Sequence, residues 1–268
     1  MTQAPIRAIA HPTDLSEASG EAFAHALRLA VEFRCRLDLL HVSRPQEDGE
    51  PAAFPRVRET LVRWGLLPAG AAPADVHKTL GVEICKIEIR HRDPLQGVAG
   101  FLQSHRPGLI VMATHGTQGL RHFLSESVSK GIAQTVLVPA LFFGPNCRPF
   151  VDVKTGSLHL KNAVIPVAHD PSPDHALHLY RALFGNLGVA EHLIHVGDRP
   201  FALSGEHEDI ATLQGPTVDS IIAAANTYLA DLLVMPTAGR HGFFDAVRGS
   251  TTEQVLRRAP CALLSLPV

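Results

Sequence analysis

Two similar stretches decide the fold: GLIVMATHGTQGLRHFLSESVSKGIAQTVLVP at residues 108–139 and DLLVMPTAGRHGFFDAVRGSTTEQVLRRAPCALLSLP at residues 231–267. Both run from a buried apolar segment through a glycine-containing loop to a helix start. Identical pairs in a gapless alignment include Val111/Val234, Met112/Met235, Thr114/Thr237, Gly116/Gly239 and Ser127/Ser250. Self-similarity of this kind is the sequence signature of a duplicated structural unit.

Two further matches occur upstream, in the same order in both halves. IAHPTDLS at 9–16 resembles IPVAHDPS at 165–172, with Asp14 opposite Asp170, and LLHV at 39–42 resembles LIHV at 193–196. Because three ordered matches are poorly explained by chance, we predict two homologous domains, residues 1–145 and 155–268. The segment PNCRPFVDVKTGS, residues 145–157, is the expected linker, since its Pro, Gly and polar residues break regular structure.

In each half, short apolar runs alternate with segments that have apolar residues at helical spacing. The expected strands are 7–10, 37–42, 82–89, 109–112, 135–138, 163–167, 191–196, 232–235 and 262–266, and the expected helices are 18–33, 95–105, 127–134, 175–187, 218–230 and 250–258. This alternation predicts an α/β protein whose two domains are open five-stranded parallel sheets with helices on both faces. Between Ser43 and Thr79 the first half is longer, and we expect a surface helix and loops there, around the single tryptophan, Trp64.

Composition limits the class of protein. With 46% hydrophobic and 19% charged residues, the 268-residue chain has enough apolar material for two cores. A formal net charge of -2 gives no broad basic field, so we expect no nucleic-acid partner. No apolar run approaches the roughly 18 residues of a membrane span, and no signal sequence opens the chain, so a cytoplasmic protein is expected. The four cysteines are far apart and are expected to be reduced thiols.

Ligands of open parallel sheets bind at the carboxyl ends of the strands. Three features follow strands there in each half: Asp14 or Asp170, the backbone near Val42 or Val196, and the Gly/Ser loop before the last helix. In the second half that loop ends Arg248-Gly249-Ser250-Thr251, and Glu253 completes a capping-box pattern with Ser250. The free N–H groups of such a helix start attract phosphate, although an ordinary N-cap has the same local sequence.

The chain resembles the universal stress protein family, as a tandem of two such domains. The residues that carry the resemblance are PTDLS at 12–16, the LLHV and LIHV strand ends, HRDP at 91–94, and VMATHG and VMPTAG. The resemblance implies Rossmann-like domains, related to the adenine nucleotide alpha hydrolase fold and packed about a pseudo-twofold axis. It also implies that edge strands pair, here those ending near Val138 and Leu266 within one chain. It further implies that two chains associate as a homodimer.

Family members that bind ATP carry a Gly, two residues, a second Gly, nine residues and then Gly-Ser. In the first half this pattern falls on Ala113, Gly116, Glu126 and Ser127, and in the second on Pro236, Gly239, Gly249 and Ser250. A carboxylate at Glu126 would repel a phosphate by roughly 4 kcal/mol at about 4 Å and an effective dielectric constant near 20. Pro236 removes only one backbone donor. The second domain is therefore the expected nucleotide site, and the first is expected to be degenerate.

The resemblance implies that ATP, or else ADP or AMP, is the bound cofactor. It assigns adenine to the aspartates and to backbone near the valines, and phosphates to the loop. The expected binding residues are Asp170, Val196, Gly239, Arg248, Gly249, Ser250 and Thr251, with Asp14, Val42, Gly116 and Ser127 in the first half. Asp170 is equally typical of a helix N-cap, and for Asp14 the N-cap is the favoured interpretation because its phosphate loop is degenerate. Arg248 and Arg240 could meet phosphates but are more typical of solvated arginines.

The sequence nominates no catalytic residue, because no nucleophile, base and orienting group occur together and no P-loop is present. At most, slow hydrolysis of bound ATP is expected. We therefore predict a nucleotide-binding sensor or regulator of the stress response with an unidentified protein partner. A nucleotide-free interaction module is the alternative. A metal-linked member is a minor alternative, based on the 16 histidines, but no spacing fixes a set of metal ligands.

Overall fold

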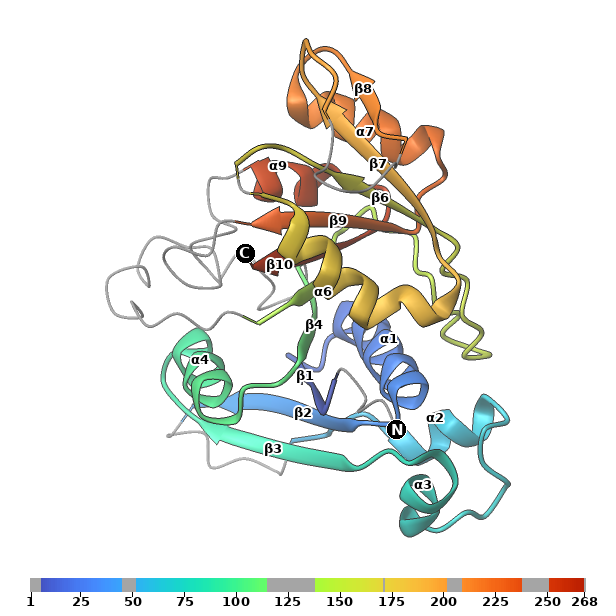
Figure 1. Ribbon diagram of the computed structural model, residues 1–268. Coiled ribbons are helices and arrows are strands. Elements are labelled where there is room, and N and C mark those ends of the chain that lie inside the picture. The colour runs from blue at the N-terminus through green and yellow to red at the C-terminus, as the bar shows by residue number, and fades with distance from the viewer. Residues whose placement is uncertain are drawn as a thin grey trace. The chain divides into compact units, whose positions relative to one another are not determined.

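The computed structural model describes residues 6–44, 52–114, 138–170, 172–201, 209–237 and 251–267. The chain divides into two compact units. Among the described residues, unit 1 contains 6–44, 52–114 and 151–159, and unit 2 contains 138–150 and everything from 160 onward. In both units helices pack against strands, which gives the α/β class expected from the alternating pattern (Figure 1).

Unit 1 is built on a parallel sheet with the strand order β3-β2-β1-β4. Its strands are β1 (Ala8–Pro12), β2 (Arg36–Ser43), β3 (Ile84–Arg90) and β4 (Leu109–Ala113). Strands β1 and β4 are almost wholly buried and the middle of β2 is buried, whereas β3 alternates between half-buried and exposed residues. Continuous apolar strands are what a parallel sheet covered on both faces requires.

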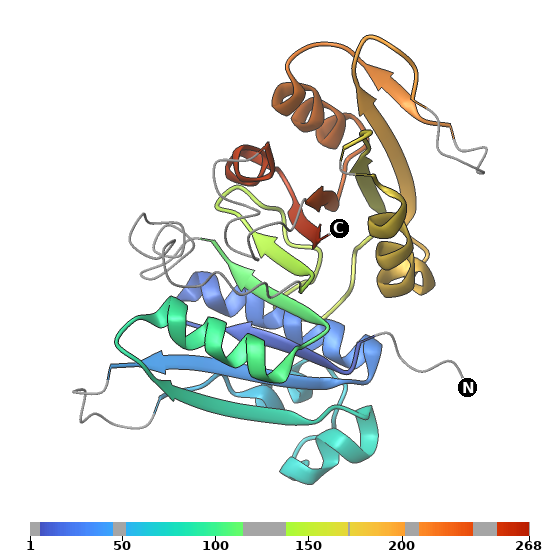
Figure 2. The same ribbon diagram turned by 60° about the vertical axis from the view of Figure 1, so that its left-hand side comes forward.

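Helices α1 (Glu17–Phe33) and α4 (Pro94–His105) cover opposite faces of this sheet (Figure 2). The HRDP motif explains where α4 begins: Asp93 is the N-cap and accepts hydrogen bonds from the next backbone N–H groups, and Pro94 fits the first turn. Gly97 lets α4 approach the sheet closely, since a Cβ there would lie 3.1 Å from Cγ1 of Val42.

The insertion between β2 and β3 forms two helices, α2 (Val57–Arg63) and α3 (Pro73–Leu80). Trp64 follows α2 directly and is 8% exposed. Its Nε1–H donates a hydrogen bond of 3.0 Å to the carbonyl oxygen of Val153. The prediction of a surface helix is therefore only partly right, because the tryptophan is a core residue.

Unit 2 contains a parallel sheet with the order β8-β7-β6-β9-β10, and β5 pairs antiparallel with β10. Its strands are β5 (Ala140–Phe143), β6 (Asn162–Pro166), β7 (Ala190–Val196), β8 (Ala211–Leu213), β9 (Leu232–Thr237) and β10 (Ala262–Pro267). The expectation that the last strands of the two halves pair within one chain is confirmed by Leu263 opposite Phe142. The strand expected at 135–138 lies mostly outside the described residues, and β5 begins two residues after Val138.

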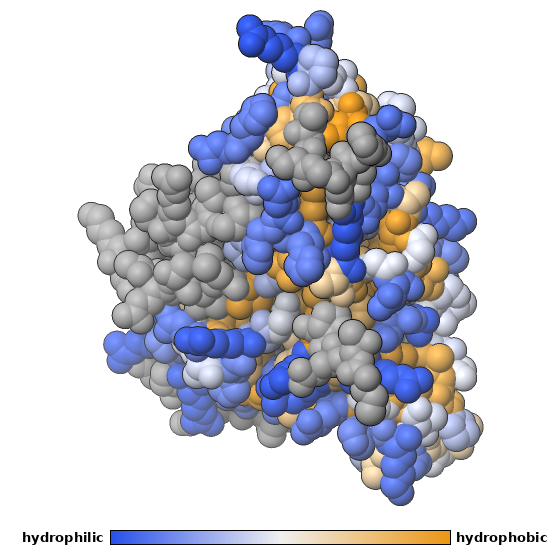
Figure 3. All heavy atoms as spheres, in the orientation of Figure 1, coloured by the Kyte–Doolittle hydropathy of each residue, from blue (hydrophilic) through white to orange (hydrophobic). Residues whose placement is uncertain are grey.

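In unit 2, α6 (Asp174–Phe184) lies on one face of the sheet, and α7 (Thr217–Thr227) and α9 (Thr251–Arg258) lie on the other (Figure 1). A short 3-10 turn, η2 (Gly185–Leu187), extends α6, so the single helix expected at 175–187 is two elements. Tyr180 and Phe184 are buried core residues on the inner face of α6. Hydrophilic residues dominate the surface seen in Figure 3, with apolar residues emerging between them. Among the described helices, none is long and apolar enough to cross a bilayer.

The expected linker carries buried apolar residues. Phe150 is 1% exposed and its ring centroid lies 5.9 Å from that of Phe143 in unit 2. Val151 is fully buried in unit 1, where its N–H donates to Nε2 of His25 over 3.1 Å. The segment 151–159 then turns back on itself, with a β-bridge between Val151 and Leu158.

Candidate functional site

The loop that leaves β1 is tightly bonded. Thr13 N–H donates to the Leu40 carbonyl oxygen over 2.8 Å, and Oγ1 of Thr13 accepts from the N–H of Leu15 over 3.0 Å. Leu15 has a left-handed backbone, with φ 64°, which is uncommon outside glycine and Asn/Asp. Asp14 is half-buried, and its Oδ1 accepts the Ser16 N–H over 3.0 Å. Since the N-cap of α1 is Ser16, the alternative that Asp14 caps the helix is wrong.

The corresponding loop of unit 2 is longer. Val167 N–H donates to the Ile194 carbonyl oxygen over 2.8 Å, as Thr13 does to Leu40, so the two strands end at equivalent positions. Residues 13–16 then lead to α1, whereas residues 167–173 lead to α6. Asp14 therefore lies two residues beyond its strand and Asp170 four beyond its own. Asp170 is exposed, and it does not cap α6, whose N-cap is Pro173.

A histidine near the end of the second strand is bound in the same way in both units. Nδ1 of His41 lies 3.0 Å from the carbonyl oxygen of Thr13, and Nδ1 of His195 lies 2.9 Å from that of Val167. In both pairs the ring N–H donates to the carbonyl, which holds the strand end against the β–α loop. These hydrogen bonds give both histidines a structural role.

A phenylalanine lies against each of these histidines. Neither phenylalanine was among the residues predicted for the site. In unit 2 the ring of Phe201 stacks on His195 at 5.0 Å between centroids and contacts His169 at 4.6 Å. In unit 1 the ring of Phe54 meets His41 edge-on at 6.4 Å. A signal was available: Phe54-Pro55 and Pro200-Phe201 both stand in the polar loop after the L-x-H-V strand.

His11 is a core residue. His11 lies within β1 opposite Leu39, where the equivalent position of unit 2 is Ile165. It is fully buried, and its Nδ1 lies 2.8 Å from the Val111 carbonyl oxygen. Nε2 has no hydrogen-bond partner among the residues described. Burial lowers the pKa of His11 to about 4, so it is neutral at neutral pH.

The glycine loops fall largely outside the described part of the chain. That holds for these predicted residues: Gly116, Glu126, Ser127, Gly239, Arg240, Arg248, Gly249 and Ser250. Thr251 is the exposed first residue of α9, and Pro236 is half-buried in β9 opposite Leu266. Val42 and Val196 are half-buried at the ends of β2 and β7, as expected.

In the described part of the chain, no group of three or more His, Cys, Asp or Glu side chains could hold a metal ion. His175 and His178, the pair at helical spacing, are both exposed on α6. The four cysteines are free thiols, as expected.

Parallel sheets covered by helices, with polar and aromatic groups at the carboxyl ends of the strands, define a tandem α/β protein of the open-sheet class. The chain belongs to the universal stress protein family: the family model matches residues 5–143 and 163–267. Among curated proteins, none matches the sequence.

Solved structures share the fold over the whole chain. A universal stress protein from Archaeoglobus fulgidus DSM 4304 is 19% identical with a TM-score of 0.61, covering 98% of this chain and 96% of its own. A functionally unknown protein from Pseudomonas aeruginosa PAO1 is 16% identical with a TM-score of 0.63, covering 98% and 92%. A putative universal stress protein from Pseudomonas aeruginosa UCBPP-PA14 is 16% identical with a TM-score of 0.59, covering 100% and 95%. At these identities the likeness concerns the fold alone.

Proposed function

We propose that the chain binds an adenine nucleotide, ATP or else ADP or AMP, at the carboxyl ends of the strands of unit 2. The observation that carries the proposal is the exposed carboxylate of Asp170, which follows His169, whose ring contacts that of Phe201 at 4.6 Å between centroids with the planes tilted by 52°. Among the described residues, Asp170 has no hydrogen-bond or ion-pair partner. A carboxylate accepts hydrogen bonds from an amino group such as that of adenine, and aromatic faces stack on a base.

The carboxyl ends of the strands of unit 1 are less suited to a nucleotide. Oδ1 of Asp14 already accepts hydrogen bonds from both the N–H and the hydroxyl of Ser16. Its phosphate loop carries Glu126 where the second half has Gly249. Both differences favour the second half, in which Gly239, Gly249, Ser250 and Thr251 would hold the phosphates at the start of α9.

On this proposal the protein is a regulator and not an enzyme that turns over. The presence or absence of bound nucleotide would be the signal in a cytoplasmic stress response. A protein partner would bind one of these two states, and the tandem chain would act as a homodimer. A nucleotide-free interaction module is the second candidate. It is favoured by Phe201, which is 9% exposed and packs against His195, so its ring already occupies part of this edge.

The test is the small-molecule content of freshly purified full-length protein, measured by mass spectrometry. We expect an adenine nucleotide in the native chain and none in Gly249→Glu, because a carboxylate near the phosphates weakens binding by up to about a thousandfold. Added ATP should raise the melting temperature of the native chain emptied of nucleotide, but not that of Gly249→Glu.

Gln254→Glu is the matched control, because it adds the same charge on an exposed position of α9 beyond the loop. It should keep its nucleotide. If native protein carries none and ATP and AMP leave its melting temperature unchanged, the interaction module replaces the nucleotide sensor. Equal loss of nucleotide in both variants would argue against the loop as the phosphate site.

A further inference from the structure

Unit 1 contains a pocket that belongs to neither strand-end site. It has a volume of about 590 Å³ and lies between α2, α3 and the first half of β3. This volume falls within the range of small-molecule sites, about 300–1,000 Å³. Helices α2 and α3 come from the insertion at residues 44–83, whereas the equivalent connection in unit 2 spans only residues 197–210.

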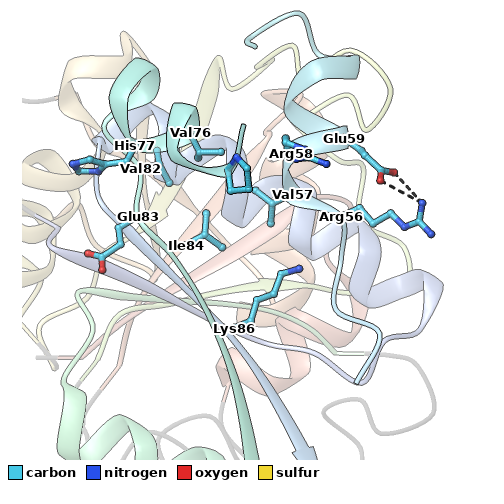
Figure 4. Close-up of a pocket in the computed structure, with 11 residues that line it drawn as sticks. Arg56, Val57, Arg58, Glu59, Val76, His77, Val82, Glu83, Ile84 and Lys86 are labelled. Carbon is cyan, nitrogen blue, oxygen red and sulfur yellow. Dashed lines mark hydrogen bonds and ion pairs between the residues drawn. The ribbon is translucent and has the colours of Figure 1, made fainter. Parts of the chain in front are cut away.

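The pocket combines apolar walls with cations. Val57, Val76, Val82 and Ile84 supply apolar surface, and Val57, Val76 and Val82 are themselves buried. Figure 4 shows Lys86 projecting from β3 below them, with Arg58 above Val57 and beside Glu59. Such a lining suits a ligand that is apolar over most of its length and charged at one end.

The charges around the pocket are unevenly placed. Arg56 and Glu59 neutralise each other through hydrogen bonds of 3.2 and 3.3 Å. Lys86 and Arg58 have no carboxylate partner among the described residues, so they remain available to an anion. Glu83 and His77 lie at the opposite side of the pocket (Figure 4). The positive charge of the pocket is therefore carried by Lys86 and Arg58, which lie on either side of Val57 in Figure 4.

We propose that this pocket binds a small organic anion with an apolar body, of the class of medium-chain carboxylates. The head group pairs with Lys86 and Arg58, and the body lies along Val76, Val82 and Ile84. The proposal is independent of the nucleotide, since none of the pocket's residues belongs to the strand ends.

The first experiment titrates full-length protein with 1-anilinonaphthalene-8-sulfonate, a fluorescent anion with an apolar body. We expect saturable binding at one site. Lys86→Glu should weaken it by about tenfold, because attraction is replaced by repulsion at this exposed position of the pocket. Lys78→Glu is the matched control: it makes the same charge change on exposed α3 without lining the pocket. It should alter affinity less than about twofold.

Competition then defines the ligand class. Decanoate should displace the probe at least about tenfold more effectively than decanol, which has the same chain without the charge. ATP should not displace it. The proposal is overturned if binding is not saturable, if the two lysine variants behave alike, or if decanol competes as well as decanoate. Should Lys86→Glu fail to fold, Arg58→Glu on α2 applies the same test.

Discussion

Lowering the pH from about 7.5 to about 5.0 should reduce the free energy of unfolding of unit 1 by about 4 kcal/mol. Burial lowers the pKa of both His11 and His25 to about 4, from 6.5 for an ordinary histidine. Between these values the unfolded chain binds protons that the folded chain excludes. Stability is therefore complete above pH 6.5 and is lost as the pH falls, by about 2 kcal/mol per histidine at pH 5.0.

The geometry at His25 shows why its protonation is unfavourable. Nδ1 lies 2.8 Å from the carbonyl oxygen of Glu21, to which it donates, and Nε2 accepts the N–H of Val151. A proton on Nε2 would face a donor instead of an acceptor, so the charged ring would lose one of the hydrogen bonds between the rest of unit 1 and residues 151–159.

Urea unfolding followed by Trp64 fluorescence measures this effect, because the only tryptophan lies in unit 1. His25→Gln should remove about half of the pH dependence between the two conditions, since glutamine does not titrate. The exposed His77→Gln should leave it intact. Equal unfolding free energies for the native chain at both pH values would show that neither buried histidine is excluded from protonation.

Local patterns in the sequence predicted most of the framework. Continuous apolar runs located β2, β4 and β9 to within two residues at each end, because their burial in a parallel sheet depends only on composition. β8 was missed, since Ala211–Leu213 is a three-residue strand in polar sequence. The loops, and the residues that they contact, have no such apolar pattern and could not be predicted in this way.

The candidate site shows where a sequence match misleads. Asp14 and Asp170 align without a gap, yet the hydrogen bonds of Thr13 and Val167 show that the loops after β1 and β6 differ in length. Backbone pairing fixes structural equivalence, and an identity within a loop does not. Phe201 was missed because its importance depends on contacts with rings on other elements.

The burial of Trp64 likewise depends on residues far along the chain, and this leads to a second large effect. Gly156→Ala should destabilise unit 1 by about 2–4 kcal/mol. Gly156 has φ +72°, and a Cβ there would lie 2.4 Å from Cδ2 of Trp64. The indole cannot move aside easily, because it is buried and bonded to Val153. The added methyl group is therefore destabilising for two reasons: it strains the left-handed backbone, and it clashes with the indole.

Gly70→Ala separates these two causes. Gly70 has φ +83°, but a Cβ added there would meet nothing within 4 Å. Alanine at this position should therefore cost only about 1 kcal/mol, the backbone part alone. Both variants are compared with the native chain by urea unfolding, with circular dichroism beside Trp64 fluorescence. Similar losses in the two variants would mean that the turn at residues 152–157 shifts to relieve the clash. A larger loss in Gly156→Ala makes the contact with Trp64 the interaction that docks this segment, because only that variant places an atom against the indole.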